Sequence, residues 1–472
     1  MKLRTNPCAA VVLSLTLMSA CVKGPDFEAP APPTAVAFRG DTPAGESVAN
    51  TEWWDLYQDP ALRSLIQAGL ENNRSVRESM AKIVEARAGL GIVRADRYPS
   101  ITGVGIGLYQ ETLLKDSVSA FDNVKVALSV GYEVDLWGRV ARSNEAALQG
   151  LLATEEAFRT VTISLVADIA GAYLTLRDLD ARLELAEATL EANRASLELL
   201  SVRAEGGLVA EVDVRRAEIN LADTEAVGQK LLRARAQTEN VLSLLVGELP
   251  YEIERGVTLA DQSFPPAVPA GLPSELLQRR PDILTMERLL HAQTAAIGIA
   301  EAARFPSLSL TSATGAKSTS LGEIVSANVF FNLGANLFGP IFNSGKSKAR
   351  VAVERAKTEQ ILNQYEQVTL NAFREVADAL VSVETYSAEH EARLRQLEAA
   401  ESALAAVEAV YEGGLVSYTE VLELQRGVFG TRLMVSEALR LHHTSIVQLY
   451  KALGGGWSVP EGFVSAAGGT EG

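Results

Sequence analysis

The pentapeptide EGGLV occupies residues 205–209 and returns at residues 412–416, each time between long segments rich in alanine and leucine. The two copies are 207 residues apart (412 − 205), and the same offset relates Arg97 of RYPS to Arg304 of RFPS. A self-match at one fixed period is the mark of an internal repeat. The sequence therefore predicts two structurally equivalent halves.

Long helices are predicted on both sides of each EGGLV. Residues 139–204 and 346–411 contain no proline, and 66 residues give about 100 Å of α-helix. The shorter segments 61–96 and 211–246 have 36 residues each, about 54 Å apiece. We predict a long helix, a turn at EGGLV and a shorter returning helix that meets its end-to-end partner. A dimeric coiled coil is the alternative, but it does not need strands.

Each half also contains two segments with the period of a β-strand. Residues 124–136 place valine, leucine and tyrosine at even positions and mostly polar residues at odd ones, and residues 101–109 alternate with glycine. Residues 307–310 and 327–337 repeat the scheme. Such strands suit either a half-buried soluble sheet or a membrane. About eight strands make the smallest transmembrane barrel, so a barrel requires several chains that donate four each.

The N-terminus is predicted to be a secretion signal over residues 1–20, because basic residues precede an apolar run too short to span a membrane. The ending MSAC resembles a lipoprotein cleavage box and predicts lipidation of Cys21. Ordinary cleavage after Ala20, which leaves a free thiol, is the alternative. Cys8 leaves with the signal, so the mature chain has no disulfide pair. The proline-rich residues 22–50 are expected to form an extended tether.

The composition argues against several classes of protein. With 59 acidic and 43 basic residues, the net charge of −16 disfavours binding to nucleic acid. No glycine-rich phosphate cradle or nucleophile elbow occurs, and the histidines lack metal-ligand spacing. These are His291, His390, His442 and His443. We expect no enzyme, no cofactor and no metal site.

Separated motifs, in one order along nearly the whole mature chain, resemble the signatures of bacterial outer-membrane factors, most closely the NodT lipoprotein branch related to TolC and OprM. They are QRRPDI (278–283), RFPSLSLT (304–311), GPIFNSGK (339–346), REVADAL (374–380) and LYKALGGGW (449–457).

The resemblance implies a mainly α fold with a small β part and a duplicated helix-strand-strand-long helix-helix unit. It also implies a homotrimer with an α-helical barrel in the periplasm and a 12-stranded outer-membrane barrel, four strands per chain. The expected domains are the signal peptide (1–20), a lipidated linker (21–50), the first repeat (51–250), an inter-repeat linker (251–272), the second repeat (273–457) and a tail (458–472).

The resemblance makes EGGLV the periplasmic tip that meets an adaptor. RAEGGL matches the docking pattern, whereas Val410 replaces the corresponding arginine in the second tip. The alternative is that the glycines only allow a tight turn. The implied docking residues are Arg203, Gly206, Gly207, Leu208, Val209, Gly413, Gly414 and Leu415.

The resemblance also implies a gate at the tip. Glu420 and Glu423 match two acidic rings, three residues apart on one helical face. Asp213 and Tyr411 match a hydrogen-bonded pair, and Arg426 matches a basic partner. Where TolC-like relatives have a latching arginine, this chain has Val416, a departure at the lock itself. A merely solvated acidic face is the alternative.

The implied function is the exit duct of a tripartite efflux system in a Gram-negative outer membrane, exporting small toxic compounds. Its implied partners are two further copies, a periplasmic adaptor, an inner-membrane pump of RND or ABC type through that adaptor, and outer-membrane lipid. Two alternatives are the outer-membrane component of type I protein secretion and a structural coiled-coil lipoprotein. Neither the cargo nor the pump can be named from the sequence.

Overall fold

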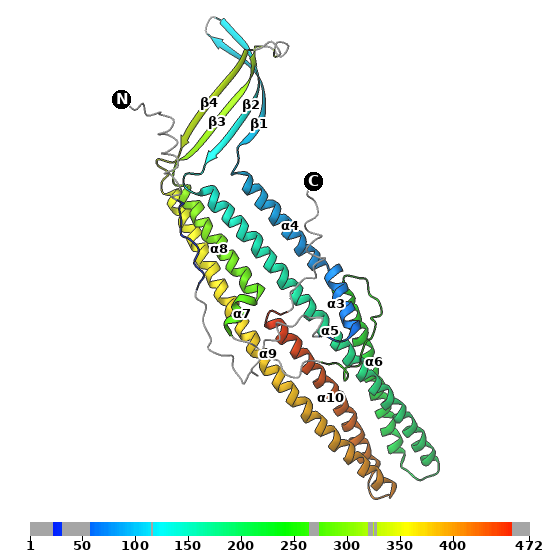
Figure 1. Ribbon diagram of the computed structural model, residues 1–472. Coiled ribbons are helices and arrows are strands. Elements are labelled where there is room, and N and C mark those ends of the chain that lie inside the picture. The colour runs from blue at the N-terminus through cyan, green and yellow to red at the C-terminus, as the bar shows by residue number, and fades with distance from the viewer. Residues whose placement is uncertain are drawn as a thin grey trace. The chain divides into compact units, whose positions relative to one another are not determined.

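The structure is a computed structural model that describes residues 22–30, 57–114, 117–263, 273–319, 324 and 328–455. The described chain is mainly helical with one four-stranded sheet, and the same order of elements runs twice (Figure 1). The predicted duplicated unit is therefore confirmed. The first repeat comprises α3 (Pro60–Asn72), α4 (Arg74–Ala95), β1 (Ser100–Leu114), β2 (Ser117–Val134), α5 (Arg139–Glu205) and α6 (Glu211–Val246). The second comprises α7 (Pro273–Arg279), α8 (Pro281–Ala302), β3 (Ser307–Ser318), β4 (Asn328–Phe338), α9 (Lys346–Glu412) and α10 (Tyr418–Ala452).

The chain divides into two compact units, described separately here. Unit 1 is Met1–Ala31, Lys82–Glu155 and Thr285–Gln367; unit 2 is Pro32–Ala81, Glu156–Leu284 and Val368–Gly472. Unit 1 holds the sheet, and unit 2 holds the EGGLV turns.

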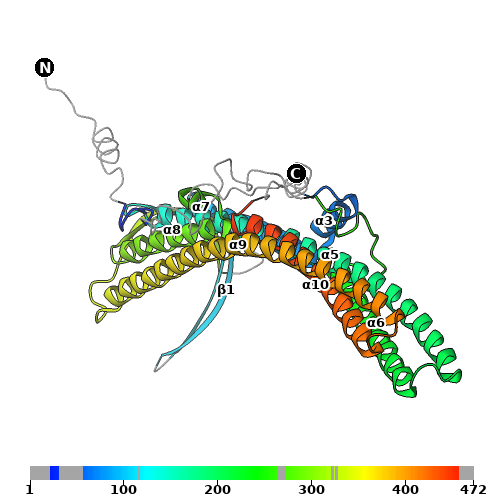
Figure 2. The ribbon, with the colours of Figure 1, turned by 90° about the horizontal axis from the view of Figure 1, so that it is seen from below.

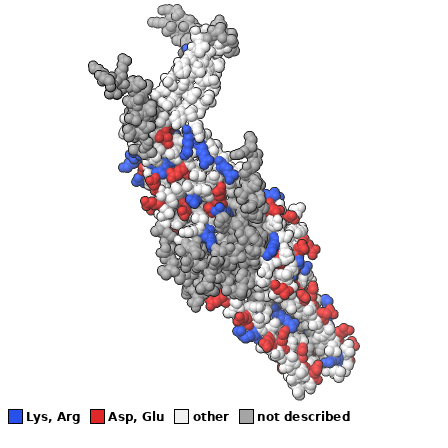
Figure 3. Space-filling view, in the orientation of Figure 1, with Lys and Arg blue, Asp and Glu red and all other residues white. Residues whose placement is uncertain are grey.

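The sheet of unit 1 is antiparallel throughout, in the order β1-β2-β3-β4. Its apolar side chains are exposed: Leu128 is 57% accessible, Phe331 72% and Leu333 76%. Figure 3 shows this sheet largely free of charged side chains, in contrast to the helices. A sheet with few charged and many exposed apolar side chains favours the membrane alternative over a half-buried soluble sheet.

The N-terminal segment, residues 22–30, packs on unit 1. The Lys23 amide donates to the Trp137 carbonyl at 3.1 Å, and the Phe27 ring stacks on His291 with centroids 4.4 Å apart. The buried Arg142 binds the Asp26 carboxylate at 2.6 Å. The extended tether expected from residue 22 is therefore wrong for residues 22–30, because contacts with α5 and α8 hold them.

The single helix expected over residues 61–96 is also corrected. Asn73 interrupts it with ψ 133°, separating α3 from α4. The Asn73 side chain caps α4 by accepting from the amides of Ser75 at 2.8 Å and Val76 at 3.2 Å. Its amide group donates to the Leu245 carbonyl at 2.8 Å, so the break is fixed by contact with α6.

In unit 2, the second part of α5 runs beside α6, and the second part of α9 runs beside α10 (Figure 2). α5 has the length and composition to cross a membrane, but half of its most apolar window is buried within the protein. That burial marks it as a core helix. The fully buried Tyr173, Leu174 and Leu176 are part of this core.

A buried carboxylate joins three parts of unit 2. Asp59 is only 1% exposed and caps α3 by accepting from the Ala61 amide at 2.9 Å. Its second oxygen accepts from the Tyr173 hydroxyl at 2.8 Å, the Val257 amide at 3.1 Å and the Gln262 side chain at 2.8 Å. One side chain thereby ties α3 and α5 to the segment that follows the first repeat.

Candidate functional site

Both EGGLV segments form the same turn between antiparallel helices. Gly207 has φ +71° and Gly414 φ +72°, a left-handed conformation that side chains other than glycine rarely adopt. In the first turn the Leu208 amide donates to the Arg203 carbonyl at 2.8 Å, and in the second the Leu415 amide donates to the Val410 carbonyl at 3.2 Å. These bonds close the helix ends, so glycine at each turn has a structural cause.

The turns also present apolar side chains to solvent. Leu208 is 77% exposed and Leu415 81%, while Val202 is 63% exposed on the last turn of α5. Val209 is half-buried against the helices behind it. The turns form without burying these leucines, so the leucine side chains are accessible to a partner.

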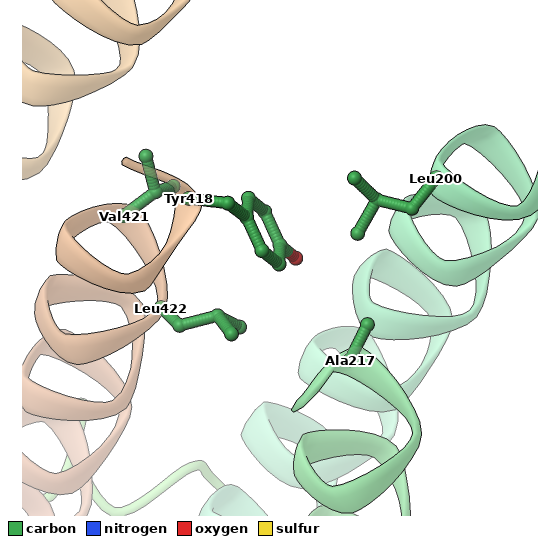
Figure 4. Packing of buried hydrophobic residues seen from close by; sticks show 5 residues of the cluster. All are labelled: Leu200, Ala217, Tyr418, Val421 and Leu422. Carbon is green, nitrogen blue, oxygen red and sulfur yellow. The ribbon is translucent and has the colours of Figure 1, made fainter. Parts of the chain in front are cut away.

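A hydrophobic cluster just behind the turns joins the two helical hairpins, α5–α6 and α9–α10, to each other. Figure 4 shows Tyr418 and Leu422 of α10 directed toward Leu200 of α5 and Ala217 of α6, and Val421 of α10 belongs to the same cluster. All five are buried, and burial raises the pKa of Tyr418 above its ordinary value. The Tyr418 hydroxyl lies 2.9 Å from the Ser196 hydroxyl. The turns therefore project from a packed base.

The Asp213–Tyr411 hydrogen bond that the resemblance implied is absent from the contacts of the described residues. The Asp213 carboxylate instead lies 3.7 Å from the Arg216 guanidinium, which donates to the Thr419 hydroxyl. The ring of Tyr411 packs on that of Tyr418, with centroids 5.7 Å apart. Arg216 and Tyr418 therefore join the hairpins here, and the sequence did not single out either.

Arg426 bridges the hairpins as a basic partner within one chain. Its guanidinium donates to the Asn220 side chain at 2.8 Å and pairs with Asp223 at 3.3 Å. The buried Asn220 amide donates to Asn193 at 3.1 Å, and Asn193 donates to the Thr224 hydroxyl at 2.9 Å. This buried polar chain was missed, although two asparagines within apolar helical faces are a recognisable signal.

The two predicted ring acids face solvent. Glu420 and Glu423 are exposed on α10, and within the described part of the chain neither has an ion-pair partner. Cys21 lies outside the described residues. Across the described ranges, no group of three or more His, Cys, Asp or Glu residues is placed to hold a metal ion.

The chain matches the family model described as outer membrane efflux protein twice, over residues 65–248 and 272–455. It is 33% identical to the cation efflux system protein CusC of Escherichia coli, with 96% of this chain and 100% of that one covered. It is 35% identical to the toluene efflux pump outer membrane protein TtgI of Pseudomonas putida, with coverage of 98% and 100%.

Solved structures agree. The chain is similar to the open state of the MtrE outer membrane channel of Neisseria gonorrhoeae, with TM-score 0.86, 30% identity and coverage of 93% and 99%. It is similar to CusC with TM-score 0.83, 32% identity and coverage of 92% and 100%. These relatives are outer-membrane efflux channels of Gram-negative bacteria, not enzymes, and they place this chain in the same membrane. The chain belongs to the outer membrane efflux protein family.

Proposed function

We propose that three copies of this chain form the exit duct of a tripartite efflux system. The duct carries small toxic compounds across the periplasm and the outer membrane when an adaptor couples it to an inner-membrane pump. The observation that carries this proposal is the sheet of unit 1: its apolar side chains are exposed, and β1 and β4 are each paired on one side only among the described strands. Such edges need further strands before they can lie in lipid.

Three copies supply twelve strands, which lies within the range of closed transmembrane barrels. The duct is passive, and the inner-membrane pump provides the drive. Around a threefold axis, Glu420 and Glu423 form acidic rings that attract cations and repel each other. Arg426, bound to Asn220, holds the hairpins together and keeps the tip closed at rest.

The docking surface for the adaptor consists of the two turns and their exposed leucines, with Arg203 and Val209 beside the first turn. Two features support this assignment: the turns are preformed by backbone bonds, and Leu208 and Leu415 are exposed without a structural need. Preformed apolar turns bind without losing loop entropy.

We also propose that Cys21 is lipidated and begins the mature chain, with the domain boundaries given above. A Cβ added at Gly138 would lie 2.8 Å from the Val22 side chain, so Val22 sits against the junction of β2 and α5. A lipid on the preceding residue would enter the membrane beside the sheet. Radiolabelled palmitate should be incorporated into the wild type and not into Cys21→Ser.

The function is tested by deleting the gene and measuring growth on a panel of toxic compounds. Wild type should restore tolerance, whereas Leu208→Ser with Leu415→Ser should not, because the docking leucines are lost. Leu244→Ser is the matched control: this leucine is 73% exposed on α6, away from the turns. Normal tolerance with a protein missing from the culture supernatant would instead indicate protein secretion, and measurable ion conductance in planar bilayers would exclude a structural lipoprotein.

A further inference from the structure

The two faces of the sheet in unit 1 differ in polarity. One face carries exposed apolar side chains, among them Val126, Leu128 and Phe331. Ser129 and Asn332 belong to the other face, because successive side chains of a strand point to opposite sides. In a transmembrane barrel the apolar face meets lipid and the polar face lines the lumen. The polar face of this sheet is therefore the one that belongs to the wall of the duct.

The charged side chains of the sheet lie on this polar face. Among the strand side chains that the structure describes, three are charged: Lys125, Glu133 and Lys317. Glu133 accepts two hydrogen bonds from the Arg139 guanidinium, at 3.0 and 2.8 Å, which compensate its charge. Neither lysine has an ion-pair partner within the described ranges. The polar face therefore keeps two uncompensated positive charges per chain.

These two lysines are neighbours. Lys125 of β2 is directly opposite Lys317 of β3, two strands that lie side by side in Figure 1. Like charges at directly opposite positions destabilise a pair of strands. The pair thus adds nothing to the pairing of the two strands, and a negatively charged group from outside the chain would relieve the repulsion.

An aromatic ring holds one of the lysines in place without cancelling its charge. The Lys125 ammonium lies over the Phe330 ring of β4, 4.8 Å from its centroid. Gly315 of β3 lies between them in the register and has no side chain in the way. A cation–π contact stabilises an ammonium group but supplies no counter-charge. Lys317 is exposed, so both charges stay available.

We propose that Lys125 and Lys317 form a positive ring on the wall of the duct, which favours anionic over cationic small molecules as they leave. The inference rests on the proposed trimeric duct, in which three copies place six ammonium groups around one lumen. Rings of charged side chains give channels their preference for ions of the opposite sign. The ligand class is small molecules that carry carboxylate, sulfonate or phosphate groups, which accept hydrogen bonds from ammonium.

The ring is far from the acidic tip. Lys125 is eight residues from Glu133 along β2, or about 27 Å at the rise of an antiparallel strand, so it lies in the part of the sheet away from the helices. The proposed acidic rings of Glu420 and Glu423 belong to the opposite end of the chain. The duct then attracts cations at its periplasmic tip and anions near its exit.

Reversal potentials across planar bilayers test the ring. The purified full chain is measured in a KCl gradient centred near 0.1 M, where the Debye length is about 10 Å. Every sample carries Glu420→Gln and Glu423→Gln, because acidic rings at the tip would otherwise dominate the selectivity. Adding Lys125→Gln with Lys317→Gln should lower the chloride-to-potassium permeability ratio at least about twofold. The difference should disappear near 1 M salt, where the Debye length is about 3 Å.

Lys125→Arg with Lys317→Arg is the matched control, because it keeps both positive charges, and it should keep the parent ratio. Lys317→Gln alone changes only an exposed side chain and should give about half of the shift, which keeps the test decisive if the double variant does not assemble. An unchanged ratio in the glutamine variants, or an equal shift in the arginine variant, would overturn the ring and leave the conducting duct standing. Absence of any current from the wild type would overturn the proposed duct, and the ring with it.

Discussion

Replacing the buried Asp59 with asparagine should destabilise the protein although the side chain keeps its shape. Asparagine has one acceptor oxygen, whereas both Asp59 oxygens accept bonds: one from the Ala61 amide, the other from Tyr173, Val257 and Gln262. If the amide group takes the first oxygen's place, the α3 cap is lost, at about 1 kcal/mol. The three remaining bonds lose their charge, at about 1 kcal/mol each. The expected cost is about 4 kcal/mol.

The assay is urea unfolding of purified protein in detergent, followed by the helical circular dichroism signal at a fixed protein concentration. Asp261→Asn is the matched control, because Asp261 lies in the segment that contains Val257 and Gln262 but accepts from the Thr258 hydroxyl at an exposed position. Asp261→Asn should change the free energy of unfolding by less than about 0.5 kcal/mol. A loss below about 1 kcal/mol for Asp59→Asn would show that these donors find other acceptors, and the reasoning would fail.

Three further predictions concern the pH dependence and the tip. Burial lowers the pKa of His443 from 6.5 to about 4. The contribution of His443 to the free energy of unfolding is therefore full above pH 6.5 and decreases by about 3 kcal/mol as the pH falls toward 4. A His443→Gln variant should show a flatter pH profile of unfolding midpoints, and an unchanged profile would contradict this cause. Arg426→Ala removes the hydrogen bond that the guanidinium donates to the buried Asn220 side chain. We expect several-fold higher conductance in planar bilayers and greater sensitivity of the cells to large antibiotics. An unchanged conductance would show that Arg426 does not hold the gate closed. Gly207→Ala, at φ +71°, should cost about 1–2 kcal/mol, whereas Gly206→Ala, which lacks a positive φ, should cost less than half of that; equal thermal shifts would contradict the turn argument.

The elements that repeat locally were predictable from the sequence. The bounds of α6 were predicted at residues 211–246, and the two long helices each extend one residue beyond their predicted ends. The alternating pattern located all four strands but not their full length. β2 begins at Ser117, well before residue 124 where regular alternation begins. Pairing with β1 extends the strand where the pattern no longer indicates it.

Features that depend on distant partners were not predictable. The packing of residues 22–30 requires Arg142, which binds Asp26, and no local pattern connects the two. The break at Asn73 is fixed by Leu245 in another helix. The chain from Arg426 through Asn220 joins separate hairpins, so the sequence shows the single residues but not which of them pair.

Because each chain carries two covalently joined copies of one unit, their tips mutate independently. The first tip has Arg203 where the second has Val410, although the turns themselves have the same backbone form. In a closed ring of such chains, every tip has neighbours of the other type on both sides. A partner protein can therefore bind in one defined orientation relative to the alternating tips. Six identical single-repeat subunits would not provide such an orientation.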